Sequence, residues 1–166
     1  MKEPKPLVEI VSTGRYLPER VVTNHELERL VDTSDEWIRE RTGIRERRIA
    51  DDATGAADMG AQAARIALDR AGLAAEDVDL IVVSTATPDR LLPSTACDVQ
   101  ALLGAHKAAA FDVAAACTGF IYALSVAEGF ITAGRGETAL IVSTEKMMAI
   151  VDWADRSTCV LFGDWA

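Results

Sequence analysis

Short apolar segments alternate with longer, partly polar ones along most of the chain, and this pattern predicts strands that alternate with helices. The strands are expected at residues 7–13, 80–83, 109–113, 138–143 and 158–162. The β-branched run at 80–83 is typical of a strand that is covered on both faces. This order of elements predicts right-handed crossovers and an α/β fold, with a mostly parallel sheet and helices on both of its faces.

Polar caps and glycines mark the ends of the expected helices. Asn24 can cap a short helix that runs to Val31, and Thr33, Ser34 or Asp35 can cap the next one. We expect helices over residues 25–31, 36–41, 54–71, 95–103 and 117–134. The second, third and fourth of these are followed closely by a glycine, which often ends a helix by adopting the left-handed conformation.

The segment after Cys117 is apolar on every side. Glu128 is its only charged residue before Gly134, and large apolar side chains spread around the whole circumference. A helix of this kind is normally buried on all sides. Polar residues interrupt it too often for a membrane span, and it is shorter than the usual span of about 20 residues. We therefore predict a buried central helix that starts at Cys117.

Cys117 itself lies where the expected strand at 109–113 turns, through three alanines, into this helix. A thiol at a helix N-terminus faces unpaired backbone N–H groups and the positive end of the helix dipole. Both favour the thiolate, which is the nucleophilic form of cysteine. The alternative is a buried cysteine that acts only as a small hydrophobic residue. Its position alone leaves both interpretations open.

The composition limits the kind of protein. The chain has 166 residues, enough for one domain (1–166) with a good core, and 49% hydrophobic residues exclude disorder. A formal net charge of −9 argues against nucleic acid as the main partner. Three widely spaced cysteines and two isolated histidines predict neither a disulfide framework nor a metal site. With no apolar signal segment and no membrane span, we expect a cytoplasmic protein.

Five arginines fall close together in this otherwise acidic chain, at positions 39, 41, 45, 47 and 48. The simpler interpretation is a solvated helix and loop in which the arginines pair with local glutamates. The alternative is a docking patch for a partner that carries phosphates or acidic groups.

Residues 111–120, which surround Cys117, closely resemble the nucleophile segment of β-ketoacyl-acyl-carrier-protein synthase III, a condensing enzyme of the thiolase fold. The similarity continues, in order, at residues 16–19, 21–24, 32–38, 41–47, 93–96, 155–156 and 161–164. The resemblance implies a thiolase-like α/β fold, of which this chain would form one half. It also favours the nucleophile over the structural interpretation of Cys117.

By this resemblance, Cys117 takes a short acyl group from acyl-CoA. The enzyme then condenses that group with malonyl-acyl-carrier protein, with decarboxylation, and so initiates fatty-acid synthesis. The backbone N–H of Cys117 would form part of an oxyanion hole. No metal and no bound cofactor are implied, because acyl-CoA is a substrate.

The resemblance also assigns binding residues. Trp37 and Arg156 would sandwich the adenine of CoA, since an indole and a guanidinium both stack on a flat base. Arg41 would face the nucleotide phosphates, and Thr33 would form a hydrogen bond near the adenine. Leu92 would reach across a homodimer interface to the acyl pocket of the other subunit. Without the resemblance, helix packing, a surface ion pair and loop packing would explain Trp37, Arg156 and Leu92.

The sequence also departs from the family. Members are about twice as long, and Trp165 stands where they have glycine. The histidine and asparagine that complete their catalytic site have no match, because His25 and His106 lie outside any matching motif. We therefore interpret residues 1–166 as the N-terminal half of an enzyme that is a homodimer at full length. We expect this half alone to be inactive.

Two alternatives remain open at this point. The missing histidine and asparagine are compatible with a non-catalytic thiolase-like subunit that pairs with a catalytic partner or only binds CoA. The same nucleophile segment would also suit a condensing enzyme that loads polyketide starter units. The sequence does not predict the acyl-chain preference.

Overall fold

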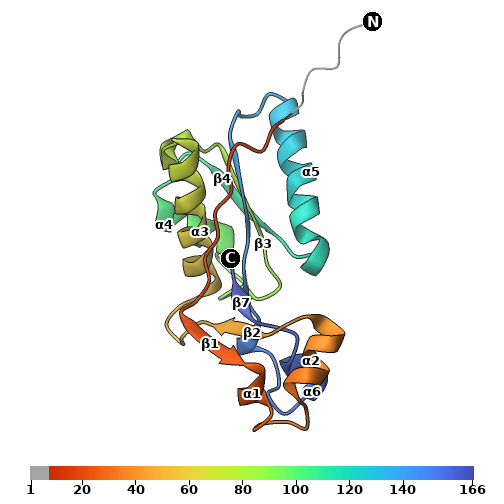
Figure 1. Ribbon diagram of the computed structural model, residues 1–166. Coiled ribbons are helices and arrows are strands. Elements are labelled where there is room, and N and C mark those ends of the chain that lie inside the picture. The colour runs from red at the N-terminus through yellow and green to blue at the C-terminus, as the bar shows by residue number, and fades with distance from the viewer. Residues whose placement is uncertain (1–7) are drawn as a thin grey trace, which may run out of the picture.

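The structure of the protein is a computed structural model that describes residues 8–166 (Figure 1). Leu7, the first residue of one expected strand, lies outside the described residues. The main sheet has three parallel strands in the order β4-β3-β5. They are β3 (Leu80–Ser84), β4 (Ala109–Val113) and β5 (Ala139–Ser143). Every residue of the central strand β3 is buried, as its β-branched sequence predicts.

Helices cover both faces of this sheet, so the predicted α/β class is confirmed. Helices α3 (Ala56–Ala71) and α4 (Thr95–Leu103) pack on one face, and α5 (Gly119–Thr132) packs on the other (Figure 1). Because side chains alternate along β3, Ile81 and Val83 join the core under α3 and α4. Leu80 and Val82 join the smaller core under α5.

A second group of elements lies beyond the carboxyl ends of the parallel strands and has its own apolar core (Figure 1). Strands β1 (Arg20–Thr23) and β2 (Glu46–Ile49) pair antiparallel there. Helices α1 (Asn24–Leu27), α2 (Asp35–Thr42) and α6 (Arg156–Cys159) belong to the same group, which we call the lower lobe. The short antiparallel pair β6 (Glu145–Lys146) and β7 (Asp164–Trp165) completes the strands of the described residues.

Most predicted helix ends are confirmed. Ser34 caps α2 and Ser94 caps α4, each by accepting a hydrogen bond from a backbone N–H three residues on. Gly43, Gly72 and Gly104 end α2, α3 and α4 in the left-handed conformation. The first short helix is different, because Thr23 rather than Asn24 caps it and it ends at Leu27.

Two predicted strands are wrong. In place of the strand expected at residues 158–162, the first two of these residues form the end of α6. The Asp155 carboxylate favours this helical turn because it accepts hydrogen bonds from the Ser157 amide and the Thr158 hydroxyl. Residues 8–13 form no strand. This segment is held on α3 instead: the Ser12 hydroxyl donates to the Ala67 carbonyl at 2.7 Å, and Arg70 donates to the Thr13 carbonyl at 2.8 Å.

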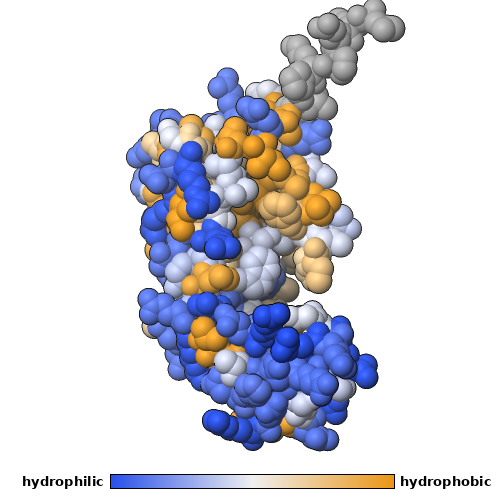
Figure 2. Space-filling model, in the orientation of Figure 1, coloured by the Kyte–Doolittle hydropathy of each residue, from blue (hydrophilic) through white to orange (hydrophobic). Residues whose placement is uncertain are grey.

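The prediction of a central helix that starts at Cys117 and is buried on all sides is also wrong. Helix α5 starts at Gly119, and Cys117 belongs to a preceding 3₁₀ turn, Ala116–Thr118. Only Gly119, Ala123 and Ala127 of α5 are buried, whereas Ile121 is 59% exposed. The physical reason is that the sheet covers one side of the helix and no described residue covers the other. Figure 2 shows apolar side chains gathered on this side of the molecule.

No helix in the described part of the chain combines the length and the apolar character that crossing a membrane would require.

Candidate active site

Cys117 lies at the carboxyl edge of the parallel sheet, in the turn that joins β4 to α5. Its side chain is exposed, whereas Cys97 is half-buried and Cys159 is fully buried. Burial raises the pKa of the Cys159 thiol, which makes that residue a poor nucleophile. Among the three cysteines, Cys117 is therefore the most exposed.

The backbone around Cys117 is strained. Ala116 has a φ of 44°, in the left-handed region that a residue with a Cβ seldom adopts. Such strain costs about 1–3 kcal/mol and persists only where the surroundings impose it. The turn therefore holds Ala116, the residue before Cys117, in a conformation that an unconstrained chain would avoid.

The backbone amides of this turn differ in whether they have a hydrogen-bond acceptor within the described residues. Thr118 donates its N–H to the Ala115 carbonyl at 3.2 Å, and Gly119 donates to the Ala116 carbonyl. Among residues 8–166, none accepts a hydrogen bond from the Cys117 amide. An exposed thiol beside a free N–H donor is the arrangement that acyl transfer to sulfur requires, because the oxyanion that forms needs a donor.

Gly119 fixes the start of α5 against the sheet. A Cβ at this position would lie 2.0 Å from Ser84 Oγ and 3.1 Å from Ser84 Cβ, at the carboxyl end of β3. Because Ser84 is itself buried, only glycine allows the helix to start this close to the strand. The position of Cys117 therefore depends on this contact two residues further along the chain.

Trp37 is the centre of a second cluster, in the lower lobe. The Arg156 guanidinium lies 4.1 Å from the centre of its ring, and the Arg41 guanidinium lies at 4.8 Å. Trp37 and Arg41 are one helical turn apart on α2, and Arg156 is the first residue of α6. The structure therefore brings together three of the four residues predicted to bind the nucleotide of CoA.

Neither guanidinium of this cluster has a carboxylate partner among the described residues. Asp155, next to Arg156, caps α6, and the hydrogen bonds from Ser157 hold the pKa of its carboxyl below the ordinary value. Two unpaired cations on one indole favour an aromatic, anionic ligand, because the ring can stack on a base while the guanidinium groups bind phosphate.

The remaining predicted residues are not among the cations on the Trp37 ring. Thr33 is two residues before α2, and its buried hydroxyl has no partner among the described residues. Leu92 is 84% exposed, in the loop that precedes α4. Cys117 belongs to the part of the structure built on the parallel sheet, which we call the upper lobe, but the end of α5 that follows it points toward α2 and α6 (Figure 1).

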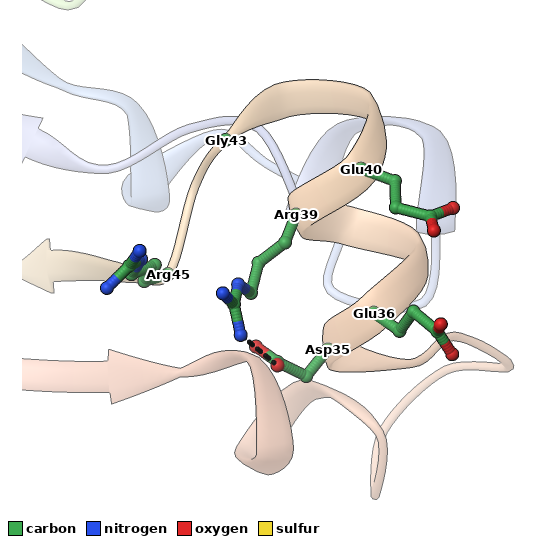
Figure 3. A pocket seen from close by; sticks show the side chains of 6 residues that line it. All are labelled: Asp35, Glu36, Arg39, Glu40, Gly43 and Arg45. Atoms are coloured by element: carbon green, nitrogen blue, oxygen red, sulfur yellow. Dashed lines mark hydrogen bonds and ion pairs between the residues drawn. The ribbon is translucent and has the colours of Figure 1, made fainter.

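The five arginines do not form one surface. Arg39 pairs with Asp35 at 3.3 Å along α2, and Arg45 lies on the far side of the same shallow pocket (Figure 3). Glu36 and Glu40 extend from the opposite side of the helix. Arg47 is only 5% exposed, so for this residue both the solvated and the docking interpretation are wrong.

Sequence reasoning also missed residues that hold the site in place. The Asp112 carboxylate accepts hydrogen bonds from the amides of Thr95 and Ala96, at 2.8 and 2.7 Å, and so joins the strand before Cys117 to the start of α4. An aspartate in the middle of an apolar strand was the available signal for this role.

The chain is similar in sequence to known proteins of one family. Residues 111–166 match the family model of 3-oxoacyl-[acyl-carrier-protein] synthase III. The β-ketoacyl-[acyl-carrier-protein] synthase III of Rhodospirillum centenum is 57% identical over 157 residues, which are 95% of this chain and 49% of the relative. The chain thus spans about half the length of the curated relatives it matches.

Solved structures give the same result. The crystal structure of 3-oxoacyl-[acyl-carrier-protein] synthase III from Aquifex aeolicus has a TM-score of 0.91 and 55% identity, over 95% of this chain and 51% of that one. A priming β-ketosynthase from a polyketide biosynthetic pathway has the same TM-score of 0.91 with 42% identity, over 95% of this chain and 47% of that one. These similarities extend over both lobes of the structure.

Proposed function

We propose that this chain, which matches the N-terminal half of β-ketoacyl-acyl-carrier-protein synthase III over nearly its whole length, carries the acyl-accepting nucleophile of such an enzyme. The observation that carries the proposal is Cys117, an exposed thiol beside an amide with no acceptor among residues 8–166. It is the residue on which the family resemblance and the geometry agree.

In the first step, the Cys117 thiolate attacks the thioester carbonyl of acyl-CoA. The carbonyl oxygen becomes an oxyanion, which the Cys117 N–H stabilises by donating a hydrogen bond. The carbon–sulfur bond to CoA then breaks, CoA leaves as a thiolate, and the acyl group stays on Cys117 as a new thioester. One difficult carbon–carbon bond formation is in this way divided into two easier reactions.

Trp37 and Arg156 bind the nucleotide end of the same substrate. The adenine stacks on the indole, the Arg156 plane covers its other face, and Arg41 faces the phosphates. In the structure Arg156 rests on the ring itself, 4.1 Å from its centre, so the guanidinium has to move outward when the base enters. The unpaired hydroxyl of Thr33 supplies a further hydrogen bond near the adenine.

In the second step, malonyl-acyl-carrier protein loses CO₂ and its carbanion attacks the acyl carbonyl. The bond to Cys117 breaks, the thiolate is regenerated, and a 3-ketoacyl carrier protein is released. The histidine and asparagine for this step are proposed to lie outside residues 1–166. His25 and His106 are both exposed, and His25 contacts Glu28. The reaction uses acyl-CoA as a substrate and needs no metal.

The full enzyme is proposed to be a homodimer in which Leu92, 84% exposed here, inserts into the acyl pocket of the other subunit. The test is a condensation assay on the product of the complete reading frame, with acetyl-CoA and malonyl-acyl-carrier protein. Formation of acetoacetyl carrier protein that Cys117→Ala abolishes supports the proposal. Undiminished product in the Cys117→Ala variant contradicts it.

A second candidate is the loading of polyketide starter units, which the 42% identity to a priming β-ketosynthase favours. The two candidates differ in the acyl group and share the chemistry at Cys117. Competition between acetyl-CoA and longer or branched acyl-CoAs in the same assay separates them. Preference for acetyl-CoA supports fatty-acid initiation, and preference for a longer starter supports the second candidate.

A further inference from the structure

Asn24 and Arg47 form a buried polar link between the two helices that carry Trp37 and Arg156. Asn24 is 1% exposed, and its side-chain amide donates to Asp35 Oδ1 at 2.9 Å, at the first residue of α2. Arg47 Nη2 donates to Asn24 Oδ1 at 2.8 Å and to the Val160 carbonyl at 3.1 Å, at the end of α6.

The link is anchored in the rest of the lower lobe. Asn24 also donates to the Ile44 carbonyl at 2.8 Å, and Arg47 Nη1 donates to the Val22 carbonyl at 3.2 Å. A side chain with several short, fixed partners has little freedom, so the two helix ends that it joins are held at a fixed separation.

Burial of the Arg47 side chain at this position carries a large desolvation cost. All of its recorded acceptors are uncharged, and its Nε is buried without a partner among the described residues. Burial lowers the pKa of its guanidinium. A buried cation without a carboxylate costs several kcal/mol, and an apolar side chain of similar size would often serve stability better. Stability alone therefore explains Arg47 poorly.

The position of the link suggests its role. Trp37 lies two residues after Asp35 on α2, and Arg156 lies four residues before Val160, on α6. The ring and the guanidinium that meet at 4.1 Å are thus carried by the two helices that Asn24 and Arg47 tie together, with Arg156 at the start of α6 and the tie at its end. A shift of either helix would change the spacing between the faces that are to hold a base.

We propose that Asn24 and Arg47 are positioning residues for the nucleotide of CoA: they set the separation of α2 and α6, and with it the width of the slot between Trp37 and Arg156. This inference rests on the proposed function. It assigns the two residues no contact with the substrate.

The test compares neighbouring acidic residues in the first turn of α2. Asp35→Ala removes the acceptor for the Asn24 amide, whereas Glu36→Ala removes an equal charge from the same turn, and no recorded hydrogen bond joins Glu36 to the link. CoA and pantetheine, which lacks the nucleotide, are titrated into each variant by calorimetry. We expect Asp35→Ala to weaken CoA binding roughly three- to tenfold and Glu36→Ala to leave it unchanged. Pantetheine binding should be the same in both.

A second variant acts directly on the link. Asn24→Asp keeps the shape and still faces Arg47, but it places a carboxylate against Asp35 and should weaken CoA binding more than Asp35→Ala does. Ile49→Val, which removes one methyl group from the apolar core of the same lobe and lowers the stability of that lobe, is the control and should not change CoA affinity.

The outcomes are distinct. If Asp35→Ala and Asn24→Asp bind CoA as tightly as the unaltered chain while Trp37→Ala does not, the positioning role is wrong and the proposed function stands. Equal losses for CoA and pantetheine would likewise contradict it, because the effect would then not concern the nucleotide. If the unaltered chain binds no CoA, both the inference and the proposed function fail.

Discussion

Arg156 stacks on Trp37, with its guanidinium carbon 4.1 Å from the centre of the indole ring, although 119 positions separate the two residues in the sequence. Arg41 approaches the same ring at 4.8 Å. This contact joins α2 to α6, and it occupies the ring face on which we propose that the nucleotide base stacks.

Trp37→Ala should therefore weaken the binding of CoA by roughly three- to thirtyfold, because the stacking surface is lost. Arg156→Ala should have a similar effect, and Arg156→Lys should restore only part of the affinity, since an ammonium group cannot stack as a guanidinium plane does. Calorimetric titration with CoA measures this. Trp165→Phe and Arg45→Ala, which alter exposed residues outside the cluster, are the matched controls. Equal affinity in Trp37→Ala and Trp165→Phe would refute the assignment.

Gly119→Ala should destabilise the fold by about 1–3 kcal/mol, because the new methyl group would overlap Ser84. Ser84→Ala removes the Oγ that lies nearest, so the double variant should recover part of the loss. Urea unfolding of the two single variants and the double variant gives the coupling energy. Independent effects at the two positions would show that the contact does not limit the start of α5.

Protonation of Asp79 should contribute to acid unfolding. Backbone hydrogen bonds from Glu137 and Thr138 lower the pKa of this carboxyl in the folded state. A lowered pKa means that the folded state favours the ionised form. The stabilisation is therefore complete above the ordinary carboxyl pKa and is lost as the pH falls from about 4 toward the folded value.

In Asp79→Asn, the free energy of unfolding should accordingly fall less steeply below about pH 4. Urea midpoints measured across the acid range test this. Asp69→Asn, at an exposed aspartate whose carboxylate accepts no hydrogen bond from the described residues, is the control for the removal of one charge. A pH profile for Asp79→Asn that runs parallel to that of the unaltered chain would show that other carboxyls dominate.

Leu92→Asp should leave the stability of the chain nearly unchanged, because the side chain is 84% exposed. In the protein from the complete reading frame, the same change should weaken dimer formation, since it would place a charge in the acyl pocket of the other subunit. Sedimentation velocity checks this, with Leu30→Asp as a control for added surface charge at an exposed leucine. Dimers of unaltered stability would place Leu92 outside the interface.

The central layers of the fold could be predicted from the sequence because their signals are local. The β-branched run of β3 and the glycines after α2, α3 and α4 each act through their own backbone or side chain. The burial of α5 was mispredicted for the opposite reason. The outer face of α5 is apolar, which is typical of a helix face that packs against other residues. The hydrophobic pattern of the helix does not indicate whether those residues belong to the same chain.

The site could be predicted only in part. Trp37 and Arg41 share a helix, so their spacing of four residues indicates that they are neighbours. No local pattern brings Arg156 to the same ring, and that pairing came from the family resemblance. The burial of Arg47 had no signal at all, because its neighbours in the sequence are exposed or half-exposed arginines and glutamates while its partners lie 23 to 113 positions away.

The most direct test of the account is to find where the acyl group goes. The protein from the complete reading frame is incubated with acetyl-CoA, and intact and peptide mass spectrometry locate the added acetyl group in this protein and in its Cys117→Ala, Cys97→Ala and Cys159→Ala variants. The account predicts one acetyl group on Cys117, present in the Cys97 and Cys159 variants and missing from Cys117→Ala. Acetylation of Cys97 or Cys159 in its place, or an adduct that survives in Cys117→Ala, would contradict it.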